Sequence, residues 1–161
     1  MVIIMKKIKI ISGIVTVAVM GLIFFFSSQT ATESSNTSSG ILDKLIYMIS
    51  PFVSMDGAMA IREVCHVIVR KSAHFILYFI LGVSAANTSF WCFKTRTIYL
   101  VLMSFVFCVL YAISDEIHQY FVPGRAMMAT DVLIDSIGAI LGCLLFFAVK
   151  RYIVRRRENG I

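Results

Sequence analysis

Four long apolar runs, separated by polar segments, set the pattern of the chain. The runs cover residues 10–26, 72–90, 98–113 and 130–149. Each is close to the ~20 residues that an α-helix needs to cross the hydrocarbon core of a bilayer. The pattern predicts an all-α, polytopic membrane protein, in which residues 1–161 form a single four-transmembrane-helix bundle.

The first apolar run follows a short basic flank that contains Lys6, Lys7 and Lys9. A basic flank before an apolar run is also typical of a secretory signal peptide. Gln29-Thr30-Ala31 is a poor match to a cleavage site, and the run is longer than the apolar core of a usual signal peptide. We therefore expect a retained first transmembrane helix.

Residues 27–71 form the longest polar connection between the runs. Its first part, residues 27–40, is rich in Ser and Thr and is typical of a linker that cannot bury apolar surface. Apolar positions in residues 41–50 and 55–70 predict two short amphipathic helices, which lie in the plane of the membrane interface or form a loop packed over the bundle. The segment is predicted to be an extracytoplasmic amphipathic helical loop.

Composition supports the membrane interpretation. The chain is 59% hydrophobic and only 15% charged, whereas about a quarter of the residues of a typical soluble domain are charged. This argues against a soluble all-α protein with buried helices. The four cysteines have no CxxC spacing and predict neither a zinc site nor a disulfide framework.

The basic residues are distributed asymmetrically along the chain. Ten of the fifteen Lys and Arg residues lie in residues 1–9, 91–97 and 150–161, and eight of the nine acidic residues lie elsewhere. The positive-inside rule then predicts that both termini and the basic tail 150–161 are cytoplasmic. With the charge explained by topology, the expected partner is the lipid bilayer, including its anionic lipids, and no nucleic acid.

Polar and charged residues gather where this topology places the outer ends of the helices. The spacing of His74 and Tyr78 puts both on one helix face, as does the spacing of Asp131 and Asp135. We expect these groups to form one polar pocket that opens outward. Its candidate residues are Lys71, His74, Tyr78, Asp115, Glu116, His118, Gln119, Arg125, Asp131 and Asp135.

Asp135 is the candidate that is hardest to explain as an ordinary surface residue. It lies about one turn inside an apolar run, where a lone carboxylate is costly. We expect it to face the bundle and either pair with Arg125, Lys71 or His74 or be protonated. Gly138 and Gly142 continue the same face and predict a close approach to another helix.

The other candidates have simpler alternatives. Asp115 and His118 are three residues apart and are also consistent with a helix cap or an exposed pair. His74 alone is consistent with a hydrogen-bonded packing residue, and Asp131 with a cap. Residues 122–125, Val-Pro-Gly-Arg, predict a tight turn that folds Arg125 back over the carboxylates.

The same residues carry a resemblance to a known family. The motifs are K-S-A-H-F-I-L-Y-F-I-L-G from Lys71, S-D-E-I-H-Q-Y-F-V-P-G-R from Ser114 and D-V-L-I-D-S-I-G-A-I-L-G from Asp131. In this order, over about residues 71–142, they resemble the VanZ-like family. The polar positions characteristic of that family map to Lys71, His74, Tyr78, Asp115, Glu116, Gln119, Arg125, Asp131 and Asp135.

The resemblance implies a small multi-pass protein of the bacterial cell membrane, linked to teicoplanin-type glycopeptide resistance or to maintenance of the cell envelope. It implies no particular reaction. Our preferred hypothesis is that the outer pocket binds a lipid-linked cell-wall precursor or a lipoglycopeptide. Arg125 and Lys71 would then meet phosphate or carboxylate through charge-assisted hydrogen bonds.

Two other hypotheses stay open. The first is an outer-leaflet enzyme, because carboxylates and a histidine serve acid–base chemistry or hold a divalent metal. The candidate groups are Asp115, Glu116, His118, Asp131 and Asp135. No H-E-x-x-H, G-x-S-x-G or established metal spacing is present, so no catalytic residue, metal ligand or cofactor is assigned. The second is a small transporter, which the scarcity of polar residues in the middle of the third run disfavours.

Overall fold

The computed structural model describes residues 2–30, 33 and 55–158, and it contains four long helices in that part of the chain. They are α1 (Val2–Ser27), α3 (Met55–Cys92), α4 (Thr97–Tyr120) and α5 (Ala129–Glu158). All four are long and apolar enough to cross a membrane. The predicted all-α, four-span architecture is therefore confirmed. The amphipathic helix predicted within residues 41–50 lies outside the described residues.

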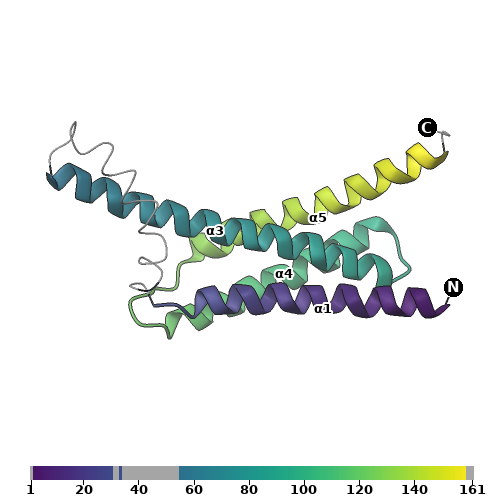
Figure 1. The fold of residues 1–161 in the computed structure, drawn as a ribbon, viewed down its shortest axis with the longest axis horizontal. Helices are drawn as coiled ribbons and strands as arrows, with labels where there is room; N and C mark the ends of the chain where they lie inside the picture. Colours follow the sequence, from purple (N-terminus) through teal and green to yellow (C-terminus); the bar gives the residue numbers. More distant parts are fainter. Residues whose placement is uncertain (1, 31–32, 34–54, 159–161) are drawn as a thin grey trace.

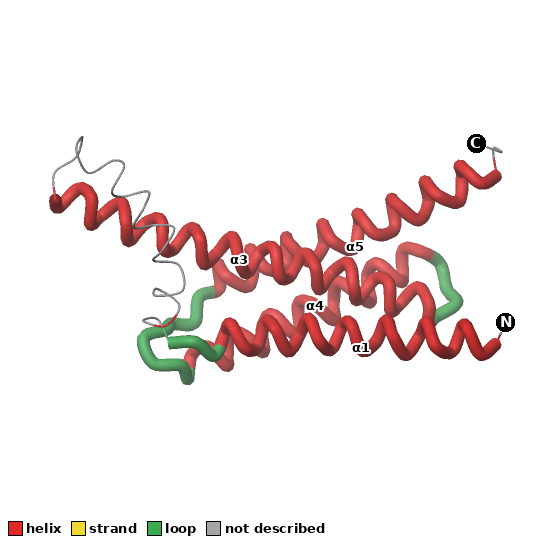
Figure 2. The backbone as a smooth tube through the Cα atoms, in the orientation of Figure 1, coloured by secondary structure: helices red, strands yellow, loops and turns green. Residues whose placement is uncertain are grey.

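The helices form a bundle in which α3 contacts each of the other three. Figure 1 shows α3 and α5 crossing each other, with α1 and α4 lying along one side of the crossing. The start of α1, the end of α5 and the α3–α4 loop lie at one end of the molecule. The loop from α4 to α5 lies at the opposite end (Figure 2).

The bundle is apolar outside and partly polar inside. Large apolar side chains such as Ile14, Leu110 and Ile137 are exposed, as expected for surfaces that contact lipid. Small and polar residues occupy many of the buried positions, among them Thr16, whose hydroxyl lies 2.9 Å from that of Thr88. Hydrogen bonds between helices thus connect α1 to α3 inside an apolar exterior.

Glycines allow α3 and α5 to pack with their backbones in close contact. A Cβ atom on Gly142 would lie 2.1 Å from the carbonyl oxygen of Phe79, and one on Gly138 would lie 2.5 Å from that of Phe75. From the α3 side, a Cβ on Gly82 would lie 2.1 Å from the carbonyl oxygen of Ala139. The close approach predicted from Gly138 and Gly142 is confirmed, and Gly82 completes it.

The polar connection before the second span differs from the prediction. Residues 55–70 are neither a separate interfacial helix nor a packed loop, because α3 runs without a break from Met55 to Cys92. Arg70, Lys71 and Ser72 lie at the start of the second apolar run but include no helix-breaking residue. Charged side chains make a helical segment favour water over lipid, but they do not interrupt its backbone hydrogen bonds.

The same reason lengthens the other helices. The predicted spans 10–26, 98–113 and 130–149 correspond to helices that continue into their polar flanks. Residues 114–120 therefore belong to α4 rather than to an outer loop, and the basic tail is helical through Glu158. The predicted turn at residues 122–125 is confirmed. Gly124 has a φ of 77°, and the Arg125 amide donates a hydrogen bond of 3.1 Å to the Val122 carbonyl.

The glycine contact yields a first prediction. Gly142→Ala forces a methyl group against the Phe79 carbonyl, and overpacking of this kind costs about 1–3 kcal/mol. We expect a lower melting temperature for the purified protein in detergent micelles, measured by a thermal-shift assay.

Gly21→Ala is the matched control, because a Cβ at Gly21 has nothing within 4 Å among the described residues. It should melt like the wild type or slightly higher, since Ala favours helix over Gly. Equal melting of both variants and the wild type would contradict the close α3–α5 contact.

Candidate functional site: a polar cluster at one end of the bundle

The first part of the cluster joins α3 to α5. Lys71 donates a hydrogen bond to Asp131 Oδ1, and an Arg70 guanidinium nitrogen lies 3.8 Å from Asp131 Oδ2. Asp131 therefore connects the first turn of α5 to two adjacent cations on α3. The alternative that Asp131 serves only as a cap is wrong, and Arg70 is a member of the site that the sequence analysis did not include.

One turn deeper, His74 and Asp135 form the second α3–α5 contact. Asp135 is fully buried, and its Oδ2 lies 3.8 Å from His74 Nδ1. Neither carboxylate oxygen of Asp135 has a hydrogen-bond partner among the described residues. Asp135 therefore faces the bundle, as expected, and of the three expected partners His74 is the one beside it. The alternative that Asp135 is protonated stays a prediction.

A second network joins α1 to α4 around Asp115. Ser27 at the end of α1 donates a hydrogen bond of 2.8 Å to Asp115 Oδ2, and Gln119 Nε2 lies 3.2 Å from the same oxygen. All three side chains are buried. Asp115 therefore belongs to the interior, so the exposed-pair alternative for this residue is wrong. Ser27 was not a candidate, because a serine at the end of an apolar run gives no distinguishing signal.

Arg125 closes this network from the α4–α5 loop. Its Nη1 donates to Gln119 Oε1, and its Nη2 donates to the Phe26 carbonyl. Each of these hydrogen bonds is 3.2 Å long. Arg125 thus folds back as predicted but reaches Asp115 through Gln119 rather than by direct pairing. Burial and the charge of Arg70 lower the pKa of the guanidinium, while Asp115 and Glu116 act in the opposite direction. An arginine remains charged under such conditions.

Glu116 and His118 lie on different sides of α4. Glu116 is buried, and its Oε2 accepts a 2.9 Å hydrogen bond from the backbone amide of Met128, which ties the α4–α5 loop to the helix end. His118 instead stacks on Phe24 with ring centroids 4.5 Å apart, and its Nε2 lies 3.1 Å from Ser28 Oγ. His118 is therefore apart from the carboxylates that it was grouped with.

Tyr78 lies between the two networks. It is fully buried, with its ring 6.2 Å from that of Tyr111. Its hydroxyl is buried and has no hydrogen-bond partner among the described residues.

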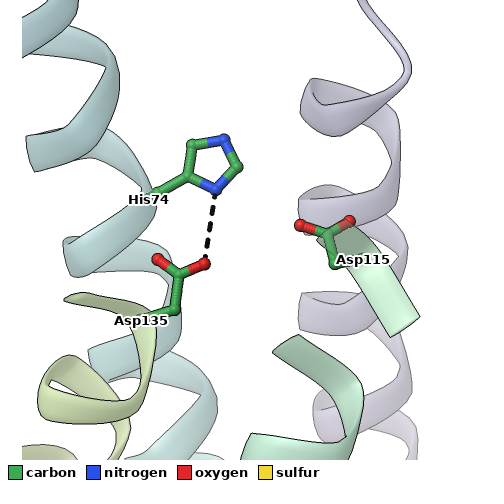
Figure 3. A group of neighbouring side chains, drawn as sticks. All are labelled: His74, Asp115 and Asp135. Carbon is green, nitrogen blue, oxygen red and sulfur yellow. Dashed lines mark ion pairs between the residues drawn. The ribbon is translucent and has the colours of Figure 1, made fainter. Parts of the chain in front are cut away.

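Three side chains from three helices converge at this point. Oxygen or nitrogen atoms of His74, Asp115 and Asp135 all lie within 4.8 Å of one another. Figure 3 shows the His74–Asp135 pair on one side and the Asp115 carboxylate facing it from α4. The three polar segments of the sequence therefore meet in space, with His118 at the periphery. Such convergence is chemically suited to holding a proton or a divalent cation between carboxylates.

Two hollows adjoin the cluster. A cavity of about 10 Å³, close to the volume needed for one water molecule, is lined by Arg70, Lys71, His74, Asp131, Ile134 and Asp135. Beside it, an open groove of about 440 Å³ is lined by Lys71, Ser72, Phe75, Ile76 and Ile134. The two share Lys71 and Ile134, so the charged interior connects to a mostly apolar outer surface.

Comparison with known proteins identifies a family for most of the chain. The family model described as VanZ/LLP1 matches residues 13–151, which confirms the resemblance noted in the sequence motifs. No curated protein and no solved structure matches the chain.

The Asp115 network yields a second prediction. Ser27→Ala removes a donor from a buried carboxylate, and an unsatisfied buried group costs about 1–3 kcal/mol. We expect Ser27→Ala to lower the free energy of unfolding in micelles by that amount.

Ser114→Ala is the matched control, since Ser114 is exposed and its hydroxyl bonds the Tyr111 carbonyl of its own helix. Denaturant titration monitored by circular dichroism compares the two variants. If Ser114→Ala loses stability and Ser27→Ala does not, the stabilising contribution proposed for the buried Asp115 network is wrong.

Proposed function

The chain belongs to the VanZ/LLP1 family of membrane proteins, and from this premise we propose that it binds an envelope ligand at the polar end of its bundle. The ligand class is an amphiphile with an anionic head, such as a lipid-linked cell-wall precursor or a lipoglycopeptide. Binding there would contribute to teicoplanin resistance or to maintenance of the cell envelope. This role is consistent with a protein built from four membrane-spanning helices.

The observation that carries the proposal is the junction between the charged cavity and the apolar groove. Lys71 stands at this junction and Arg70 lines the cavity beside it, and both are suited to bind phosphate or carboxylate. Phe75, Ile76 and Ile134 line the groove beside them and suit a lipid chain. A head group and its chain would therefore meet matching surfaces on α3 and α5.

In the present proposal, Arg70 replaces Arg125 as the second cation that binds the ligand beside Lys71. Arg125 is held by Gln119 and the Phe26 carbonyl on the α1–α4 side, so its role in the proposal is to hold that side of the site together. Arg70 takes its place next to Lys71, where both pair with Asp131. A ligand anion would compete with Asp131 for these two side chains.

We also propose that the polar end faces outward in the cell membrane of a bacterium, with both termini in the cytoplasm. Support comes from the positive-inside distribution of Lys and Arg. The arrangement in Figure 1 is consistent with it, since the start of α1 and the end of α5 lie opposite the α4–α5 loop. The basic end of α5 then meets the anionic cytoplasmic leaflet.

The orientation yields a third prediction. Phe121 lies in the α4–α5 loop and Phe93 in the α3–α4 loop, and both are exposed. The two loops lie at opposite ends of the bundle (Figure 1). In a background with Cys65 and Cys92 replaced by Ser, Phe121→Cys should react with a membrane-impermeant maleimide on intact cells. Phe93→Cys should react only after the cells are permeabilised. The reverse pattern would contradict the proposed orientation.

The ligand proposal yields a fourth prediction, tested in cells that lack this protein. Lys71→Met removes the cation and keeps most of the side-chain length. A charge-assisted hydrogen bond is worth about 1.5–3 kcal/mol, so ligand binding should weaken about tenfold or more. The minimum inhibitory concentration of teicoplanin should fall to that of cells without the protein.

Lys94→Met is the matched control, because it removes one exposed lysine at the opposite end of the bundle. It should protect like the wild type, with membrane levels of all variants compared by immunoblot. If Lys71→Met inserts normally and still protects fully, the proposed ligand site is wrong.

The convergence of His74, Asp115 and Asp135 favours one alternative, an enzyme acting at the outer leaflet. A buried carboxylate beside a histidine is a common arrangement for acid–base catalysis. Under this alternative the groove would hold a substrate whose reacting group reaches the three side chains. Turnover of a lipid-linked substrate by the purified protein would distinguish catalysis from binding.

A further inference from the structure

We propose that His74, Asp115 and Asp135 form a binding site for one divalent metal ion of the first transition series, such as Zn²⁺ or Mn²⁺. The three side chains come from α3, α4 and α5 and offer one nitrogen and two carboxylate oxygens within 4.8 Å of one another. The site lies inside the bundle rather than on its surface, since Asp115 and Asp135 are buried.

The three ligand atoms are close enough for side-chain rotation to bring them onto a single ion. Metal bonds to imidazole nitrogen and carboxylate oxygen are about 2.0–2.2 Å long, so two ligands at a tetrahedral angle on one ion lie about 3.5 Å apart. The three atoms lie within 4.8 Å of one another, so rotation of the side chains would have to bring them closer on binding. His74 and Asp135 are already closer, at 3.8 Å.

Unpartnered buried atoms point into the site. Both oxygens of Asp135, Oδ1 of Asp115 and the hydroxyl of Tyr78 have no hydrogen-bond partner in the described part of the chain. All three side chains are almost fully buried. Buried polar groups are nearly always satisfied, and each exception calls for a missing partner. A cation at the centre would satisfy the carboxylates together, with Tyr78 or a water molecule as a further ligand.

Charge supports the same conclusion. Two carboxylates in an apolar surrounding are costly unless matched by positive charge. Arg125 reaches Asp115 only through Gln119, and Lys71 and Arg70 are paired with Asp131. One divalent ion balances Asp115 and Asp135 and accepts neutral His74 as its nitrogen ligand. Mixed imidazole and carboxylate ligands suit Zn²⁺ and Mn²⁺.

The cavity beside His74 and Asp135 provides space next to the ion. Arg70, Lys71 and Asp131 also line it. Three protein ligands leave a position of the ion open, as at catalytic zinc sites. The metal inference does not rest on the proposed envelope ligand, because it follows from the three side chains alone.

The test measures metal binding by the purified full-length protein with no envelope ligand present. The protein is prepared without a histidine tag, in phosphatidylcholine nanodiscs and with Cys92→Ser, and is stripped with a chelator. It is then dialysed against Zn²⁺ or Mn²⁺ and analysed by mass spectrometry and, for Mn²⁺, by electron paramagnetic resonance. We expect one ion per chain.

Variants locate the ion. Asp135→Asn and Asp115→Asn should each weaken binding at least about tenfold, since even outer-shell changes cost about 10–100-fold. Glu63→Gln is the matched control, because it removes an exposed carboxylate on α3 three turns before His74, and it should bind like the wild type. Size-exclusion profiles and helix content check folding, and His74→Gln gives an independent readout if an Asp variant fails to fold.

Absence of saturable binding, or equal binding by the wild type and Asp135→Asn, overturns the metal site. Asp135 would then be neutralised by a proton or by protonated His74. Neither result bears on the teicoplanin assay of Lys71→Met, so the metal site and the ligand proposal fail separately.

Discussion

The close contact between α3 and α5 is the constraint on which the rest of the structure depends. At Gly82, Gly138 and Gly142 the two backbones lie so close that no side chain fits between them. Hydrophobic attraction does not drive helices together within lipid, so such packing and interhelical hydrogen bonds supply the association. The contact fixes the rotation and register of α5 against α3, and with them the facing of Asp131 toward Lys71 and of Asp135 toward His74.

The polar cluster in turn joins the remaining helices at one end. Asp115 is held by Ser27 of α1 and by Gln119 of its own helix, while Arg125 links Gln119 to the end of α1. Buried polar groups of this kind are costly when a partner is lost and specific when all partners are present. The same end of the bundle therefore holds a specific set of hydrogen bonds between helices. It also holds carboxylate oxygens of Asp115 and Asp135 that have no partner among the described residues.

Much of this could be predicted from the sequence. Apolar run length predicts the four spans, the cost of a buried carboxylate predicts that Asp135 faces inward, and small residues four apart predict close packing. The ends of the helices could not be predicted, because charge at Arg70 or Asp115 bounds an apolar run without ending a helix. The hydrogen-bond partners of Asp115 also could not be predicted from the sequence. They depend on how α1 is rotated against α4, and spacing within one helix carries no information on that rotation.

The unbroken length of α3 has a geometric consequence. Its 38 residues, at about 1.5 Å each, give a rod about 57 Å long, nearly twice the ~30 Å hydrocarbon thickness. In Figure 1 its Met55 end reaches beyond the rest of the bundle. Lys71 and His74 lie near the middle of this rod, between the protruding part of α3 and Gly82, where the helix packs closely against α5. The residues of α3 that face Asp131 and Asp135 are therefore at the point where the helix leaves the bundle.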